Sequence, residues 1–126
     1  MGGLEIGSFA APDEALELDR AQAQSITVGG VTVWRFVFEP GWRYTEHFEP
    51  EPCTAPHAGY IIGGRLRVRM ADGTEGEAGP GEVLIIAPGH DAWTIGDESC
   101  FMIDFGASVP AATGSDTAES ATPESR

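Results

Sequence analysis

The side chains in this sequence that can do chemistry are mainly imidazoles and thiols. The histidines are His47, His57 and His90, and Cys53 lies between the first two. Imidazole nitrogen and thiolate sulfur suit zinc, copper, nickel and ferrous iron, whereas calcium and magnesium prefer oxygen ligands. Neither a C-x-x-C nor an H-x-x-x-H spacing is present. A metal site therefore requires a fold that brings separate segments together.

Each of these residues also has a simpler interpretation. His47 lies beside Glu46 and Glu49 and can be a solvated loop residue. Cys53 stands in a proline-rich stretch and can be a small apolar filler, as free cysteines often are. Its closeness to His57 also permits a nucleophile with a neighbouring base, although the sequence identifies no third, orienting group. The histidines can equally well serve only as hydrogen-bonding groups in a degenerate pocket.

Other side chains can contribute to a site or to the core. Cys100 falls in an apolar run and is expected in the core, whereas Asp104 in the same run must find a partner or face outward. Trp42, Tyr60 and Trp93 have two interpretations. They either pack in the core, which is the usual fate of such side chains, or line the mouth of a site that selects a flat organic ligand.

The elements that must position these residues are short strands. The segment 31–38 alternates with apolar side chains on both faces, which predicts a well-buried strand. The segment 65–70 alternates arginines with apolar residues and is followed by the Asp72-Gly73 turn signal of a hairpin. Further apolar runs follow between Gly and Pro breakers, at 83–86, 93–95 and 100–105. Such short, regularly spaced strands predict an all-β sandwich or jelly-roll barrel.

The two ends of the chain differ from this pattern. Residues 13–22 are the one helix candidate, although an extended arm over the barrel fits the same residues. From about residue 107 the sequence consists of small, polar and acidic residues that cannot bury enough apolar surface to order themselves. We therefore expect an N-terminal arm at 1–24, a barrel at 25–106 and a disordered acidic Ser/Thr/Ala tail at 107–126.

Composition excludes several functions. The net charge of −13 and the absence of lysine argue against a nucleic-acid partner and exclude Schiff-base chemistry. No apolar run approaches the roughly 18 residues of a membrane span, and the start lacks the pattern of an export signal. We therefore expect no membrane partner, a cytoplasmic location and free thiols. The arginines at 65, 67 and 69 predict a solvated outer face rather than an anion-binding patch.

Two stretches resemble the two-part signature of the cupin superfamily. In the first, Gly41 is followed after five residues by His47, and His57 after six residues by Gly64, which is similar to G-x5-H-x-H-x(3,4)-E-x6-G. In the second, the stretch from Gly81 to His90 is similar to G-x5-P-x-G-x2-H-x3-N. The resemblance covers about residues 31–105 and looks strongest to small single-domain cupins with a G-W segment and a P-G-H-D-A-W segment. It implies a double-stranded β-helix, the cupin jelly-roll barrel, with a metal inside.

The first stretch departs from the family pattern and can be aligned in two registers. Counting back from His57, which stands in the glutamate position, Cys53 takes the place of the second histidine and Glu51 that of the first. Counting forward from Gly41, His47 is the first histidine and Glu49 replaces the second. Both registers stay open on the sequence alone.

The second stretch departs in a different way. An ungapped count places Ala92 at the histidine position, whereas a turn shortened by two residues places His90 there. We prefer the shortened turn, because a loop deletion costs little while strand register is fixed by the core.

The resemblance implies a metal site made by His47, Cys53, His57 and His90 for a divalent transition metal such as Fe, Zn, Ni or Cu. It further implies a metal-dependent enzyme of the dioxygenase, isomerase or lyase type that acts on a small organic molecule. The alternatives are a non-catalytic module that senses a small molecule or a metal, and a dimerisation scaffold. A homodimer is expected under each of them.

Overall fold

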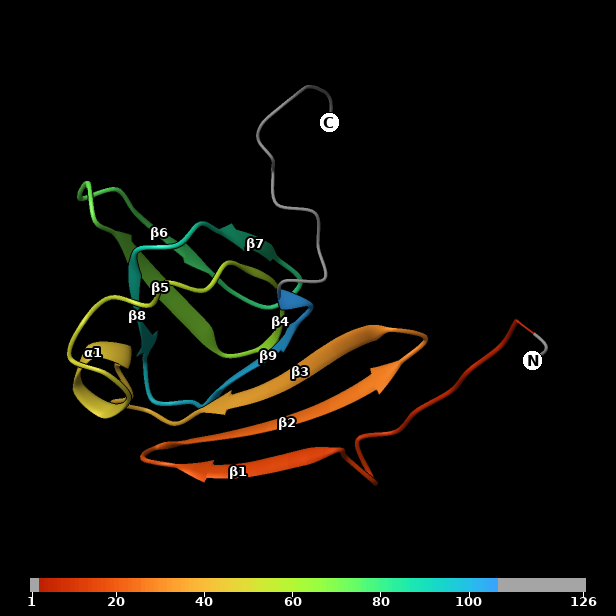
Figure 1. The fold of residues 1–126 in the computed structure, drawn as a ribbon. Coiled ribbons are helices and arrows are strands. Elements are labelled where there is room, and N and C mark those ends of the chain that lie inside the picture. The colour runs from red at the N-terminus through yellow and green to blue at the C-terminus, as the bar shows by residue number, and fades with distance from the viewer. Residues whose placement is uncertain (1–2, 107–126) are drawn as a thin grey trace, which may run out of the picture.

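A computed structural model describes residues 3–106, which are almost entirely β-structure (Figure 1). The strands form a six-stranded sheet of order β1-β2-β3-β9-β4-β7 and a three-stranded sheet of order β6-β5-β8, and every pairing is antiparallel. The elements are β1 (Glu14–Leu18), β2 (Ala21–Val28), β3 (Val31–Phe38), α1 (Tyr44–His47), β4 (His57–Gly63), β5 (Arg65–Met70), β6 (Glu75–Ala78), β7 (Val83–Ile86), β8 (His90–Ile95) and β9 (Cys100–Asp104). This architecture confirms the predicted all-β fold.

The alternating segments of the sequence form strands where they were expected. The segment 31–38 is β3, and the Asp72-Gly73 turn joins β5 to β6. The degree of burial of β3 was predicted wrongly, because only Phe38 is fully buried and Val31 is 41% exposed. The outer face of β2 and β3 is met by the chain before β1, where the Phe9 ring lies against Arg35 and Gly7 lies close to Val28, and this covering is only partial.

The helix considered for residues 13–22 is wrong, because this segment forms β1, a turn and the start of β2. Arg20 has a φ of 58° and turns the chain between the two strands. β2 pairs with β3 along its whole length and buries Ala21 and Ala23. This long-range pairing outweighs the weak helical preference of the segment. β2 also runs across the predicted boundary at residue 25, and the predicted tail at 107–126 lies outside the described residues.

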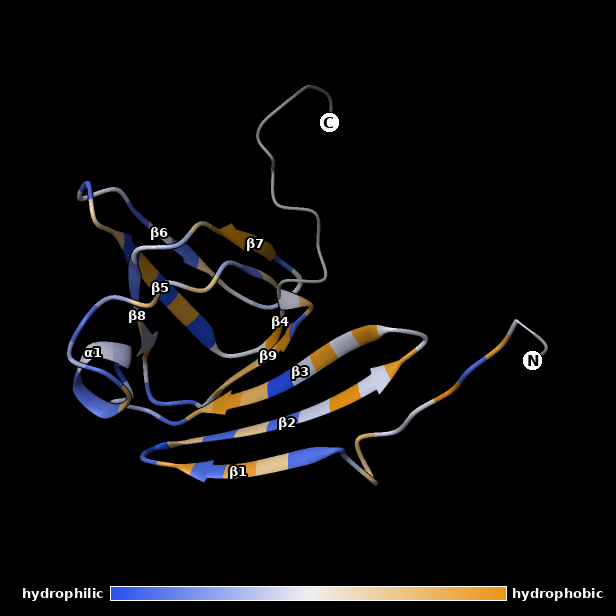
Figure 2. Cartoon of the chain, viewed as in Figure 1, coloured by the Kyte–Doolittle hydropathy of each residue, from blue (hydrophilic) through white to orange (hydrophobic). Residues whose placement is uncertain are grey.

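The core lies between the two sheets. Ile61 of β4 and Cys100 and Met102 of β9 come from the large sheet, and Leu66 and Val68 of β5 come from the small one. Figure 2 shows the matching alternation of hydrophobic and hydrophilic residues along β5. The core position predicted for Cys100 is confirmed, since its side chain is 0% exposed. Each large side chain buried here contributes about 1.5–3 kcal/mol.

The outer face of the small sheet carries the arginine stripe. Arg65 and Arg67 form ion pairs with Glu77, Arg67 and Arg69 with Glu75. The predicted solvated face is therefore confirmed, and its cations are matched by carboxylates on the neighbouring strand. Such exposed pairs contribute little to stability, about 1 kcal/mol or less each.

The outer face of the large sheet is apolar around β4, β7 and β9. Its exposed side chains include Tyr60, Ile62, Val83, Ile85 and Phe101, and Figure 2 shows β7 as a hydrophobic strand. The homodimer expected from the resemblance stays a prediction. None of the helical structure in residues 3–106 is long and apolar enough to span a membrane.

Gly64 connects β4 of the large sheet to β5 of the small one, and we expect it to tolerate no side chain. Its φ is +74°, and a Cβ there would lie 2.3 Å from the Ser99 carbonyl oxygen. Gly64→Ala should lower the free energy of unfolding by about 2–4 kcal/mol, through left-handed strain plus overpacking. Chemical denaturation measures this change.

Gly73→Ala is the matched control, because its φ is +91° and nothing lies within 4 Å of the added Cβ. It should cost only the strain, about 1–2 kcal/mol. Equal losses in the two variants would contradict the close packing assigned to the β4–β5 connection.

Candidate metal centre

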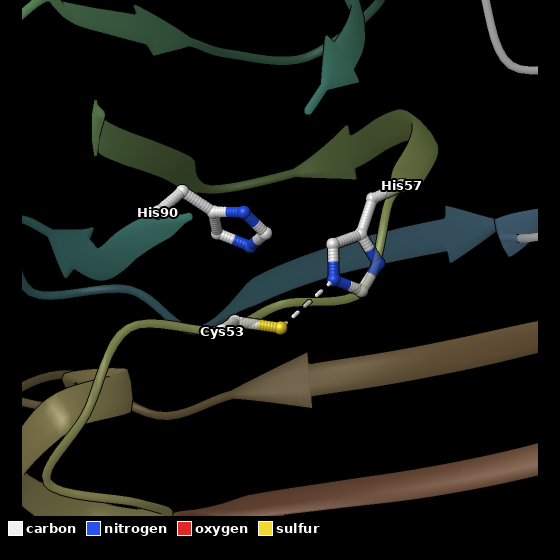
Figure 3. Close-up of side chains that lie close together, drawn as sticks. All are labelled: Cys53, His57 and His90. Atoms are coloured by element: carbon white, nitrogen blue, oxygen red, sulfur yellow. Dashed lines mark hydrogen bonds between the residues drawn. The ribbon is translucent and has the colours of Figure 1, made fainter. Parts of the chain in front are cut away.

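Cys53, His57 and His90 come together inside the barrel (Figure 3). Cys53 lies in the loop between α1 and β4, while His57 and His90 are the first residues of β4 and β8. One ligand atom from each lies within 4.8 Å of the others. Metal–ligand bonds of about 2.0–2.3 Å place two ligand atoms about 3.5 Å apart. Small side-chain rotations therefore bring all three groups onto one ion.

Backbone pairing holds Cys53 against His90. The Cys53 N–H donates to the His90 carbonyl oxygen at 2.7 Å, and the N–H groups of Gly89 and His90 donate to the Cys53 carbonyl oxygen at 2.7 and 3.2 Å. The loop before β4 is thus attached to the start of β8 by a short antiparallel bridge. The thiol and the imidazole owe their closeness to this bridge.

Asp104 orients the ring of His57. The His57 Nδ1–H donates to Asp104 Oδ2 at 2.5 Å, and the Cys53 Sγ lies 3.5 Å from His57 Nε2. Asp104 is 1% exposed, and its Oδ1 accepts hydrogen bonds from the N–H groups of Ala58 at 3.3 Å and Gly106 at 2.6 Å. With Nδ1 engaged, His57 presents Nε2 to the cluster.

His90 is oriented in the same manner by a main-chain oxygen. Its Nδ1–H donates to the Ala87 carbonyl at 2.9 Å, and its ring packs edge-on against that of His57 with 5.1 Å between centroids. Both imidazoles therefore have Nδ1 engaged outside the cluster, which leaves Nε2 as the nitrogen that can serve as a ligand. A carboxylate or carbonyl behind each metal-binding histidine is the arrangement that fixes ring orientation in metalloproteins.

Electrostatics favour a thiolate at Cys53. Burial alone would raise the pKa of this thiol, but hydrogen bonds from His57 and His90 outweigh it and lower the pKa to about 5. Burial would likewise lower the pKa of His57, but the hydrogen bonds to Asp104 and Cys53 raise it to about 9. Between these values the metal-free pair is a thiolate and an imidazolium.

This arrangement can serve two kinds of chemistry. Two imidazoles and a thiolate can hold a transition metal with a coordination position left open. The series Cys53, His57 and Asp104 also provides a nucleophile, a base and the orienting carboxylate that the sequence did not identify. Both uses need the same atoms, so a metal bound here excludes the nucleophile.

A largely apolar cavity of about 170 Å³ adjoins the three ligands. Aromatic rings form much of its wall, and Trp42 stacks on Phe38 with 4.1 Å between ring centroids. The full lining is Phe36, Phe38, Trp42, Tyr44, Phe48, Cys53, His57, Leu66, Ile86, His90, Ala92 and Met102.

The fourth predicted ligand, His47, does not join the other three. His47 is the last residue of α1. Its Nδ1 accepts a hydrogen bond from the Arg43 backbone N–H at 3.0 Å, so this nitrogen is engaged within the helix. Glu49 and Glu51, the alternative first-stretch ligands, are exposed. The structure thus combines Cys53 from the backward register with His90 from the shortened turn.

Of the three aromatic residues proposed for the mouth, only Trp42 lines the cavity. Tyr60 is 44% exposed on β4, because strand alternation turns it away from the inward-facing Ile61. Trp93 lies outward on β8 beneath Arg43, whose guanidinium carbon is 4.4 Å from the ring centroid. Alternation with the buried Ala92 fixes that direction.

Sequence reasoning missed the role of Asp104 and the contribution of Tyr44. An aspartate inside an apolar run did signal a buried, partnered carboxylate, but the identity of the partner depends on the pairing of β9 with β4. Tyr44 carried no signal, because it belongs to a four-residue helix between strands. Burial and the neighbouring Cys53 raise the pKa of the Tyr44 phenol to about 12, so it stays a protonated donor.

Comparison with known proteins identifies the fold. No family model and no curated protein matches the sequence. Among solved structures, oxalate decarboxylase from Lactobacillus farciminis in a formate complex aligns with a TM-score of 0.60 at 15% identity, over 82% of this chain and 32% of that one. The polyketide cyclase RemF from Streptomyces resistomycificus aligns with a TM-score of 0.62 at 17% identity, over 82% of this chain and 78% of that one. A cupin-2 domain from Rhodospirillum rubrum aligns with a TM-score of 0.54 at 17% identity, over 80% of this chain and 65% of that one.

We expect the metal-free protein to contain a thiolate at neutral pH. As the pH rises, the far-ultraviolet absorbance of one thiolate should appear around pH 5, because hydrogen bonds to the histidines favour the charged form of Cys53. Cys100 is the internal control, since burial raises its pKa to about 12. Cys53→Ser should remove the early transition, and a first transition above pH 8 would contradict the assigned pairing.

Asp104→Asn should lower the metal affinity of the centre, although Asp104 is not itself a ligand. The amide cannot accept hydrogen bonds from His57 and from the main chain as the carboxylate does, so the His57 pKa falls and the Cys53 transition moves to higher pH. Metal affinity should fall about 10- to 100-fold, as for other substitutions behind a ligand. Competition with a coloured chelator measures the affinity, and an unchanged value would show that Asp104 has no part in the site.

Proposed function

Since this chain has the cupin fold shared by those structures, we propose that it binds one divalent transition metal through Cys53, His57 and His90 and acts on a small organic molecule in the adjoining cavity. The observation that carries the proposal is the convergence of the three ligand atoms within 4.8 Å. The engagement of both Nδ1 atoms outside the cluster, which leaves the Nε2 atoms as the possible ligands, supports it.

The three donor atoms limit which metal ions suit the site. Two imidazoles and one thiolate suit zinc, copper, nickel and ferrous iron, and a thiolate ligand disfavours calcium and magnesium. When bound, such a metal supplies Lewis-acid or, for iron, dioxygen chemistry. A dioxygenase, isomerase or lyase type of reaction fits this site, and a decarboxylase and a cyclase occur among the proteins of similar fold.

The residues of the chain have separate tasks in this proposal. Cys53, His57 and His90 hold the ion, and Asp104 keeps His57 in the tautomer that binds it. The aromatic wall excludes water and positions the organic molecule. Tyr44 lines the cavity, and its hydroxyl hydrogen-bonds to Cys53.

The alternative function is a non-catalytic module that senses a metal or a small molecule. One observation favours it, because no carboxylate among the described residues lines the cavity beside the ligands. Asp104 lies behind His57, and Glu49 and Glu51 are exposed. A turnover assay cannot separate the two functions before the metal is known, so metal content is measured first. A reducing compartment such as the cytoplasm suits both, since the thiols of Cys53 and Cys100 are unpaired.

We expect untagged protein to purify with one transition-metal ion per chain. His57→Ala and His90→Ala should each weaken the binding at least about tenfold, because each removes a ligand. Elemental analysis, followed by cobalt titration with its thiolate charge-transfer absorption, measures content and affinity.

His47→Ala is the matched control, because this histidine hydrogen-bonds to Arg43 outside the cluster. It should retain the metal of the original protein. Loss of metal in His47→Ala but not in His90→Ala would transfer the site to the forward register of the first stretch, and a protein that takes up no transition metal would reject the proposal.

A further inference from the structure

We propose that the molecule taken up beside the metal centre is compact, is built on a single apolar ring whose polar group faces the centre, and carries no charge away from the centre. This inference rests on the proposed function, because it names the class of molecule that meets the same centre. Three features of the cavity lead to it: its size and walls, the lack of charged side chains away from the centre and the grouping of its polar atoms.

The size and walls of the cavity match one ring. The cavity measures about 170 Å³, and Phe36, Phe38 and Trp42 form one part of its lining while Leu66 and Ile86 belong to another. An apolar protein cavity of about 150 Å³ stays dry and takes up benzene. A six-membered ring therefore fits with little space to spare, and it gains offset stacking against the aromatic wall.

Away from the metal centre, the cavity lacks the cations that an organic acid needs. No Arg, Asp or Glu is among its lining residues, and the chain has no lysine. Arg43, which precedes α1, is held by Asp91 at 2.7 Å and lies over the outward-facing Trp93. A buried carboxylate without a partner is strongly disfavoured. The second carboxylate of a dicarboxylic acid would have no partner here, and the net charge of −13 further opposes anions.

The polar atoms of the cavity are grouped together. Cys53, His57 and His90 lie within 4.8 Å of one another, and the Tyr44 hydroxyl interacts with the Cys53 sulfur. Tyr44 also lines the cavity, and because its one O–H is directed at the Cys53 sulfur, its oxygen is left to accept a hydrogen bond. A ligand satisfies both parts of the cavity when its ring faces the apolar wall and its hydroxyl donates to the Tyr44 oxygen.

Calorimetric titration of the cobalt-loaded protein with four probes tests the inference. The probes are phenol, toluene, benzoate and oxalate, and the same series is repeated on the metal-free protein. In the metal-free protein phenol should bind at least about tenfold more tightly than benzoate and oxalate, because no unpaired cation lines the cavity and each acid must bury its charge. Oxalate or benzoate binding as tightly as phenol to the metal-free protein would overturn the inference.

Two variants test the geometry. Tyr44→Phe keeps the ring and removes the hydroxyl oxygen that accepts the hydrogen bond of the ligand, so phenol affinity should fall about three- to tenfold while toluene affinity stays the same. Ala92→Leu fills the cavity and should abolish binding of both ring probes without changing cobalt stoichiometry. Ala71→Leu, at an exposed alanine, is the matched control and should bind both as the original protein does. Unchanged ring binding in Ala92→Leu would place the ligand elsewhere.

Failure of the proposed function and failure of this inference give different results. If no cobalt binds but the metal-free protein still ranks phenol above oxalate, the metal centre is rejected and the ring ligand is supported. If cobalt binds with full stoichiometry but neither form takes up phenol or toluene, the metal centre is kept and the ring ligand is rejected.

Discussion

The buried carboxylate of Asp104 governs the state of the groups around it. A charge that is 1% exposed between two β-sheets is tolerated only when its oxygens are fully hydrogen-bonded or paired. The Asp104 oxygens accept from His57 Nδ1 and from the N–H groups of Ala58 and Gly106. This requirement fixes the tautomer and the direction of the His57 ring, and through Nε2 it sets the state of Cys53.

The pairing of strands within the sheets fixes the positions of the residues in the centre. β9 pairs with β4 so that Asp104 lies opposite Gly59, two residues along the strand from His57. A Cβ at Gly59 would lie 2.6 Å from the Met102 sulfur, so this glycine gives Met102 the space to reach the cavity. Each side chain of the centre is thus placed by backbone hydrogen bonds of the barrel. Sites placed in this manner are held more precisely than sites on free loops.

The sequence predicted the parts of this arrangement that depend on local pattern. Alternation located most strands, and residue types together with the family resemblance identified Cys53, His57 and His90 as candidates. Alternation could not show that His47 is taken up by the Arg43 backbone, because this contact depends on a four-residue helix. It also could not identify His57 as the partner of Asp104, because the two residues are 47 positions apart in the chain. Contacts of that kind depend on strand order, which alternation does not encode.

The metal-free and metal-loaded forms are two ways of balancing the same charges. In the metal-free centre a proton lies between His57 Nε2 and the Cys53 sulfur, and the resulting ion pair persists because Asp104 compensates the imidazolium. In the proposed metal-loaded form, a divalent ion would replace that proton and be held by the same two residues together with His90. Since Asp104 and the Ala87 carbonyl already hold both rings, little ordering entropy would be lost in the exchange. The apolar wall would strengthen the charge interactions of the ion by limiting the water that screens them. A site preorganised around a buried acid therefore needs no carboxylate among the residues that line its cavity.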